Sequence, residues 1–409
     1  MRTKSVFFLF LGMTLIIQPL FSQDKGSQGE EKEQNKKLEL KFYGFIKGDM
    51  VYAAQGVYSW GDPVNNYVSS PQFASGVDEA ALGFTAQHSR IGLRGSVGEK
   101  IKVGGVAEID FYGGPSDANT KPRLRLAYAS VATGGFELRV GQQWDLISPN
   151  NANTVNTNGN LWFGGNIGFR RAQFQASYTL KSEVFAPMLQ LSVGEAAREA
   201  TGLGKDNLSA QPMIQARLSG KILKKYTVGV AFAHAAFKEK KGTPVGDQFL
   251  VDDFIFNTTG FGVDVNLPFH KYFSLTGEFN TGTNLNNANL FSAAGNYYWT
   301  LKNGEVVEYD RKSTTAWFNA TSEVTSWLNL VVGYGMDNNT SSSFKVGAVE
   351  KNTTWYADAI FPIKHGFSVT FEYQNIVTTM VKGVDSQGEI SERSDNDANV
   401  ISLSAKVNF

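Results

Sequence analysis

The last nine residues of the chain, 401–409, read ISLSAKVNF and alternate between apolar and polar side chains. Counted back from the C-terminal Phe409, every second residue is apolar: Val407, Ala405, Leu403 and Ile401. Successive side chains of a β-strand point to opposite faces, so the two faces of this segment must meet different surroundings. A soluble sandwich strand has the same pattern, so the fold is decided by its repetition along the chain.

The same alternation returns throughout the sequence, for example in residues 272–280 and 366–374. It predicts about sixteen strands: 38–54, 82–97, 100–113, 121–133, 136–148, 166–180, 185–195, 212–221, 226–238, 252–267, 272–284, 313–324, 327–339, 351–362, 366–381 and 397–409. Residues 290–301 are a further candidate strand inside what otherwise resembles a long loop. The sequence therefore leaves sixteen and eighteen strands open.

The connections between these strands alternate in length. Seven are short, at 98–99, 134–135, 181–184, 222–225, 268–271, 325–326 and 363–365. Eight are long, at 55–81, 114–120, 149–165, 196–211, 239–251, 285–312, 340–350 and 382–396. Short periplasmic turns opposite long extracellular loops are typical of an all-β, antiparallel transmembrane barrel. A soluble propeller or tandem sandwiches are the alternative, although neither requires this alternation.

Three segments are expected along the chain. Residues 1–22 predict a secretory signal peptide, with two basic residues before an apolar stretch and a cleavage site after Ser22. Residues 23–37 have almost no apolar side chains and are expected to be a solvated polar tail. No later stretch approaches the roughly 18 apolar residues of a spanning helix. We therefore expect residues 38–409 to form a barrel in the outer membrane of a Gram-negative bacterium, in contact with its lipid.

The composition excludes several kinds of chemistry. The 38 Lys+Arg residues balance the 38 Asp+Glu residues, so no global field favours nucleic acid. The absence of Cys removes thiol catalysis, disulfides and Cys-based zinc sites. The four His residues include no His-x-x-x-His pair, and we expect no metal centre, no cofactor and no enzyme activity. Acidic clusters at Asp252-Asp253 and Asp395-Asn396-Asp397 leave open calcium binding at loop rims.

A barrel of about sixteen strands is too wide for its side chains to fill, so its inner face lines an aqueous channel. The alternation places seven basic side chains on this face: His88, Arg90, Arg94, Arg123, Arg125, Arg139 and Arg171. Nearby counter-charges are Glu108, Asp110 and Asp145, with Glu137, and the second half of the chain adds Asp264, Glu278, Asp358 and Glu372. Either the arginines pair with these acids and stiffen the wall, or unpaired guanidinium groups attract carboxylates or phosphates. Because the arginines outnumber the nearby acids, we expect some positive field to survive.

The third long loop, residues 149–165, reads PNNANTVNTNGNLWFGG and is a candidate constriction loop. It contains six Asn and no charged residue, and Trp162 and Phe163 need burial. Folded into the channel, it would supply amide groups without cancelling the arginine charge. A solvated external loop is the alternative.

Several of these segments together resemble the DcaP-like outer-membrane porins. The resemblance covers residues 82–180 and is carried by the runs HSRIGLRG (88–95), EIDFYG (108–113), RLRLAY (123–128) and GQQWD (141–145). It implies a sixteen-stranded, trimeric porin whose arginine-rich lumen favours small anions, often carboxylates. By position, the resemblance assigns the lumen cluster to Arg90, Arg94, Arg123, Arg125 and Arg139. The chain departs from the family at Ala127, where a further basic residue is usual, and in its short polar tail.

The sequence thus predicts a porin, a water-filled channel for passive diffusion of small hydrophilic solutes, with a preference for small anions. A substrate-specific channel with a saturable site is the nearest alternative. A barrel enzyme, or a receptor or adhesin that uses loops 55–81 and 285–312, would belong to another class. A TonB-dependent importer is disfavoured because no plug-sized segment precedes the barrel.

Overall fold

The computed structural model describes residues 38–55, 80–113, 121–159, 161–196 and 209–409. The expected signal peptide (1–22) and polar tail (23–37) lie outside the described residues. Within the described ranges, no helix has both the length and the apolar character needed to cross a membrane.

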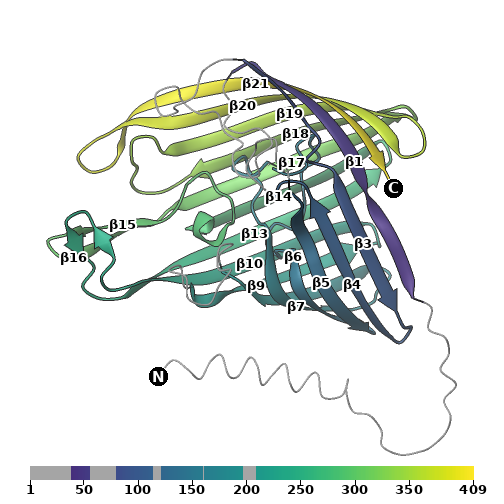
Figure 1. Ribbon diagram of the computed structural model, residues 1–409, viewed down its shortest axis with the longest axis horizontal. Coiled ribbons are helices and arrows are strands. Elements are labelled where there is room, and N and C mark those ends of the chain that lie inside the picture. Colours follow the sequence, from purple (N-terminus) through teal and green to yellow (C-terminus); the bar gives the residue numbers. More distant parts are fainter. Residues whose placement is uncertain (1–37, 56–79, 114–120, 160, 197–208) are drawn as a thin grey trace, which may run out of the picture. The chain divides into compact units, whose positions relative to one another are not determined.

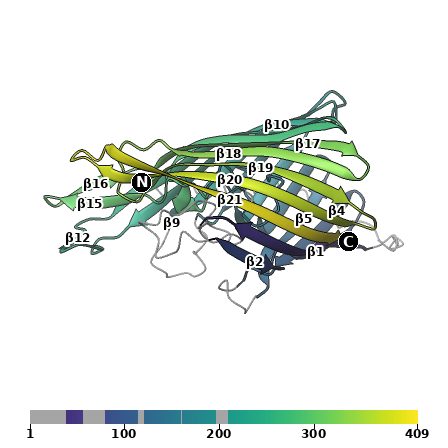
Figure 2. The ribbon, with the colours of Figure 1, turned by 90° about the horizontal axis from the view of Figure 1, so that it is seen from above.

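Antiparallel strands form a closed barrel (Figures 1 and 2). In the described part of the chain, seventeen strands make one sheet, and β2 and β3 share one position beside β1, which gives sixteen positions around the ring. The ring closes where the first strand pairs with the last, from Phe45 opposite Asn408 to Ala53 opposite Val400. The predicted fold class is therefore confirmed.

The strands of the ring carry the labels of Figure 1. In the first half they are β1 (Glu39–Ala53), β2 (Ala81–Thr85), β3 (Arg90–Val97), β4 (Ile101–Asp110), β5 (Arg123–Thr133), β6 (Phe136–Trp144), β7 (Arg170–Thr179), β8 (Phe185–Gly194) and β9 (Ser209–Ile222). In the second half they are β10 (Tyr226–Glu239), β13 (Phe254–His270), β14 (Phe273–Thr283), β17 (Lys312–Thr325), β18 (Leu328–Asn339), β19 (Val349–Pro362), β20 (Phe367–Val384) and β21 (Ile390–Asn408).

The chain outside the ring forms two small hairpins. One joins β11 (Pro244–Val245) to β12 (Gln248–Phe249), and the other joins β15 (Tyr298–Lys302) to β16 (Glu305–Tyr309). The β15–β16 hairpin projects from one end of the barrel (Figure 1). The candidate strand 290–301 is therefore not part of the wall, and the ring has sixteen positions and not eighteen.

The second predicted strand, 82–97, was wrong as one continuous element. It is divided into β2 and β3, and a turn closed by a 3.0 Å hydrogen bond from Ser89 N to Ala86 O separates them. The physical reason lies in the neighbouring strand β1. Ser89 Oγ accepts a 3.0 Å hydrogen bond from Lys47 N, and His88 contacts Asp49, so polar side chains replace part of the ladder between the strands.

The wall separates apolar and polar side chains as the alternation predicts. On β20, Phe371 is 51% exposed and Glu372 is 2% exposed, and on β21 Ile401 is 49% exposed and Ser402 is fully buried. The exposed apolar face is the outer surface, as a barrel in contact with lipid requires. The buried polar face points into the lumen, where the functional groups gather.

Candidate functional site

The long segment between β6 and β7, residues 145–169, folds against the inner side of the wall, and we call it the inserted loop (residue 160 is not described). Its two ends meet at Asp145, whose backbone N–H donates to Phe169 O at 2.8 Å. The Asp145 carboxylate accepts hydrogen bonds from Phe169 N at 2.9 Å and from Arg171 Nη2 at 2.8 Å. These hydrogen bonds hold the two ends of the inserted loop together.

The first arm of the inserted loop is bound to inward side chains of β9 and β14. Gln215 Oε1 accepts hydrogen bonds from the backbone N–H groups of Leu146 and Ile147 at 2.9 and 3.2 Å. Glu278 Oε1 accepts one from Asn150 N at 2.6 Å. The other oxygen of Glu278 contacts Ser148 Oγ and lies 3.1 Å from Trp317 Nε1. The predicted inward acid Glu278 is thus occupied by the loop.

The middle of the loop reaches the far wall. Asn153 N donates to Asn319 Oδ1 of β17 at 3.2 Å, and Val155 N donates to Glu372 Oε2 of β20 at 2.7 Å. From β1, Lys47 Nζ donates to Val155 O at 2.8 Å. The loop backbone therefore crosses from β6 to strands on the other side of the ring.

The tip of the loop meets two predicted lumen residues. His88 Nε2 lies 3.1 Å from Asn156 Oδ1, and its Nδ1 lies 2.5 Å from Asp49 Oδ2. Arg123 Nη2 donates to Asn158 Oδ1 at 2.6 Å. His88 is buried, so its place in this structure is to hold the loop and not to face open water.

The returning arm of the loop buries its aromatic residues. Trp162 and Phe163 are 1% and 7% exposed, and they form a cluster with Phe169 and Phe291. The ring centroids of Trp162 and Phe291 are 4.5 Å apart. Asn352 Nδ2 of β19 donates to Phe163 O at 2.7 Å.

A group of charged side chains on β3, β4 and β5 makes up the arginine ladder: Arg90, Arg123 and Arg125 with Glu108 and Asp110. Arg125 bridges both acids at 2.8 Å, and Arg123 binds Asp110 through two bonds of 2.9 and 2.5 Å. Arg90 Nε lies 3.5 Å from Glu108 Oε1. Three guanidinium groups therefore share two carboxylates, and the ladder is partly paired.

The remaining predicted arginines lie apart from this ladder. Arg171 is at the base of the inserted loop with Asp145. Arg139 pairs with its strand neighbour Glu137 at 3.0 Å, and both are partly exposed. The exposed Arg94 has its guanidinium carbon 5.6 Å from the centre of the Tyr43 ring.

Arg170 is a functional candidate that the sequence analysis missed. Its guanidinium carbon lies 5.0 Å from the Trp144 ring centre and 4.6 Å from that of Phe169, and the residue is 4% exposed. Among the described residues, Nε and Nη1 of Arg170 have no hydrogen-bond partner. Alternation assigns only one of two consecutive residues to the lumen. The signal that was available is position, because both arginines are the first residues of β7 and directly follow the inserted loop, and both are buried.

Inward acids and bases elsewhere on the wall pair with each other. Arg217 of β9, also missed by the sequence analysis, binds Asp264 of β13 through bonds of 2.9 and 2.7 Å. Lys47 and Asp49 of β1 contact each other beneath the loop tip. Their spacing of two on one strand was the signal for a shared face.

The acidic residues considered for calcium make hydrogen bonds within the protein. Asp395 and Asp397 lie within β21, which begins earlier than predicted, and Asp395 Oδ1 accepts a 2.6 Å hydrogen bond from Thr379 Oγ1. Asp253 accepts a bond from Lys241 N at 2.8 Å. In the described part of the chain, no group of three or more His, Cys, Asp or Glu side chains is placed to hold a metal ion.

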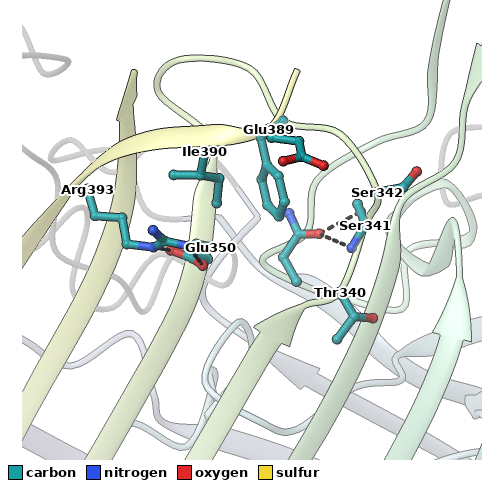
Figure 3. A pocket seen from close by; sticks show the side chains of 9 residues that line it. Thr340, Ser341, Ser342, Glu350, Glu389, Ile390 and Arg393 are labelled. Carbon is teal, nitrogen blue, oxygen red and sulfur yellow. Dashed lines mark hydrogen bonds and ion pairs between the residues drawn. The ribbon is translucent and has the colours of Figure 1, made fainter. Parts of the chain in front are cut away.

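An open pocket of about 330 Å³ lies between residues 339–344 and the start of β21 (Figure 3). Arg393 crosses one side of it and donates to both oxygens of Glu350, at 2.6 and 2.9 Å. The lining is mostly hydroxyl and charged groups, with Phe344 and Ile390 as apolar members. These groups are separate from the arginine ladder in sequence and in their contacts.

The fold is shared with several porins of known structure. No protein-family model and no curated protein matches the sequence. The DcaP outer-membrane channel of Acinetobacter baumannii is 19% identical and has a TM-score of 0.68, with 91% of this chain and 97% of that chain covered. An anion-selective porin from Comamonas acidovorans is 11% identical with a TM-score of 0.56, over 91% of this chain and 100% of that chain. The trimer form of OmpT from Vibrio cholerae is 12% identical with a TM-score of 0.54, over 91% and 99%.

These likenesses define the fold of the protein. The chain has the closed, antiparallel β-barrel fold of these outer-membrane porins. The resemblance to the DcaP-like porins is confirmed at the level of the fold, which extends over nine-tenths of the chain and not only over residues 82–180.

Proposed function

We propose that the protein is a passive diffusion channel of the outer membrane for small hydrophilic solutes, and that it favours small anions such as carboxylates. The barrel of sixteen positions is wide enough to hold water. The inserted loop is proposed to be the constriction, because its backbone is bound to strands on both sides of the lumen.

The balance of charge beside the loop carries the anion preference. Arg90, Arg123, Arg125 and Arg170 supply four positive charges against two from Glu108 and Asp110, a local excess of two. Guanidinium groups stay protonated and bind carboxylates through forked hydrogen bonds. Low-dielectric walls strengthen such a field where the passage is narrow. The buried Arg170, with two nitrogens that lack a partner among the described residues, is the observation on which this proposal depends most.

Liposome swelling tests the proposal. Liposomes that contain the purified protein should swell in an uncharged sugar, and faster in a small carboxylate salt than in a cationic amino-acid amide of similar size. Swelling at the rate of empty liposomes in every solute would contradict a channel. Faster entry of the cation would contradict the anion preference alone.

A channel with a saturable carboxylate site is the second candidate. It is favoured by Arg170 and the aromatic side chains of Trp144 and Phe169 beside it, because a guanidinium binds the carboxylate of an aromatic acid and aromatic side chains can pack against the ring of that acid. Benzoate should then block chloride current with a saturating concentration dependence, whereas a simple diffusion channel shows a linear one.

We also propose a homotrimer. The support is the fold shared with a porin whose trimer form is known, and the broad apolar outer face of the barrel. Light scattering of the protein in detergent would give the mass of three chains; the mass of one chain would contradict the trimer.

A further inference from the structure

A second loop also folds into the lumen. Residues 284–297, which we call the second loop, follow β14 and contain the short 3-10 helix Leu285–Ala288. Asn284 fixes where the loop starts: its side chain donates to Asn257 O at 2.9 Å and to Asp310 Oδ1 at 2.8 Å, and its Oδ1 accepts from Arg311 N at 2.8 Å. The buried Asn284 thus links the start of the second loop to residues 310–311, where the chain returns to the wall.

The far end of the second loop is held by Asp337. This fully buried residue of β18 accepts hydrogen bonds from Ala293 N at 2.7 Å and from Ser292 Oγ at 3.2 Å. Asp337 lies on the buried face of β18, as Val331 does, so the bond is made inside the barrel. The second loop therefore runs along the inner wall from β14 to β18.

The two loops pack on each other. Phe163 N of the inserted loop donates to Phe291 O at 3.3 Å, and Arg171 Nη2 donates to Ala288 O at 2.9 Å. The Trp162 and Phe291 rings are in contact. Movement of one loop therefore disturbs the other.

Apolar side chains fill the space between the two loops and the wall. The loops contribute Ile147, Ile167, Leu285, Ala288, Leu290 and Tyr297, and we call these residues the apolar wedge. They form one buried cluster with inward residues of β9, β10 and β13: Met213, Ala231, Ala233, Ala235, Phe237 and Phe256. An aqueous lumen would leave these positions wet, so the wedge covers this part of the wall.

The wall is shaped to receive the wedge. A side chain at Gly260 would place its Cβ 3.0 Å from Ile147 Cδ1 and 3.1 Å from Leu285 Cδ2, and one at Gly282 would lie 2.6 Å from Leu285 Cδ2. The ring of Tyr297 is stacked on Phe256, with centroids 4.0 Å apart. The glycines form a recess for two apolar side chains, one from each loop.

From these contacts we propose that the second loop is a further specificity-determining element. It closes the β9–β14 side of the lumen to water and confines solutes to the side lined by the arginine ladder. The inference rests on the proposed channel function. It states that two loops, and not the inserted loop alone, limit the cross-section of the pore. A solute then passes close to the basic groups, because the opposite side of the lumen is packed.

Thiol accessibility tests this inference, because the chain has no native Cys. Ala235 is fully buried, and its cross-strand partner Thr258 donates to Asn284 O at 2.7 Å. In the otherwise intact protein, Ala235→Cys should not react with a charged methanethiosulfonate, whereas the partly exposed Arg139→Cys should react. Reaction of Ala235→Cys at the rate of Arg139→Cys would overturn the inference.

Two loop replacements complete the experiment. Replacing residues 286–296 by a Gly-Ser linker of equal length should expose Ala235→Cys to the reagent and raise the single-channel conductance several-fold. The matched control replaces residues 301–306, at the tip of the projecting β15–β16 hairpin, and should change neither quantity. Where the first replacement does not fold, Asp337→Ala, which removes both acceptors of the loop end, should give a smaller change in the same direction. Unchanged conductance and accessibility in a folded replacement would contradict the second loop's role, while a parent protein without channels would contradict the proposed function itself.

Discussion

Val155 N donates a hydrogen bond of 2.7 Å to Glu372 Oε2, across 217 positions of the sequence. The bond joins the middle of the inserted loop to β20. Gln374 Nε2 donates to the other carboxylate oxygen of Glu372 at 3.0 Å. Glu372, which the sequence analysis lists among the inward acids, is here a fixed acceptor for a backbone N–H group.

Replacing Glu372 should loosen the inserted loop. Glu372→Ala leaves the buried N–H of Val155 without its acceptor, at a cost of about 1–3 kcal/mol. We expect larger fluctuations of the open-channel current in single-channel recordings. Glu350→Ala, which removes one acid from the pocket between residues 339–344 and β21, is the control and should leave the current noise unchanged. Equal noise in both variants would refute this role of Glu372.

Arg170 should contribute more to the anion preference than Arg171, which is paired with Asp145. Arg170→Gln lowers the local excess of charge from two to one and removes no salt bridge between residues that the structure describes, so the permeability ratio of chloride to potassium should fall with little loss of stability. Arg393→Gln, at the pocket between residues 339–344 and β21, is the matched control and should leave the ratio close to that of the parent. A ratio unaffected by Arg170→Gln would show that its charge does not act on the passage.

Arg171 should matter for stability. Its guanidinium binds Asp145, the backbone carbonyls of Glu195 and Ala196, and Ala288 O of the second loop. Arg171→Ala leaves a buried carboxylate without its cation, which costs about 3–5 kcal/mol. On SDS gels of samples heated to increasing temperatures, the band of the folded barrel should disappear at a lower temperature than in the parent. An unchanged temperature would contradict the structural role of this pair.

The approach of the inserted loop to β18 depends on a missing side chain. A Cβ at Gly335 would lie 2.0 Å from Gly164 O, which is a severe clash with backbone. Gly335→Ala should therefore displace the returning arm and increase the conductance. Gly48→Ala, at a position where no atom of the described residues lies within 4 Å of the added Cβ, is the control. Identical conductance in the two variants would show that the arm does not limit the passage.

Salt should weaken the selectivity. The Debye length falls from about 10 Å at 0.1 M to about 3 Å at 1 M, so the field of the partly paired ladder reaches less of the passage. The chloride preference should decline across this range. A preference independent of salt would indicate selection by size or by contact instead of by field.

The wall of the barrel could be predicted from the sequence because each strand places apolar side chains on its lipid face and polar side chains on its lumen face. Strands β10, β13 and β17 begin and end within three residues of the predicted segments, and the closing pair of β1 with β21 joins the first and last predicted strands. The interruption at Ala86–Ser89 was not predicted, because it depends on side chains of β1 that lie far away in sequence.

The interior was harder to predict for a physical reason. Alternation says which residues face inward, but not what covers them, so Ala233 and Glu278 were indistinguishable from water-lining positions. The inward alanines at 231, 233 and 235 and the glycines at 260, 262 and 282 were signals of a close approach, which the two loops explain. Arg123 and Arg125 were predicted on the inner face, but their sharing of Asp110 depends on strand register that the sequence does not encode locally.

Reversal potentials in a planar bilayer with a KCl gradient test the central claim most directly. The purified protein should form discrete channels. At low salt, the reversal potential of their current should be displaced toward the chloride equilibrium potential, which reports anion preference. A reversal potential displaced toward the potassium equilibrium potential would contradict the role of the arginine ladder. The absence of any channel activity in a correctly folded, membrane-inserted preparation would contradict the diffusion channel itself.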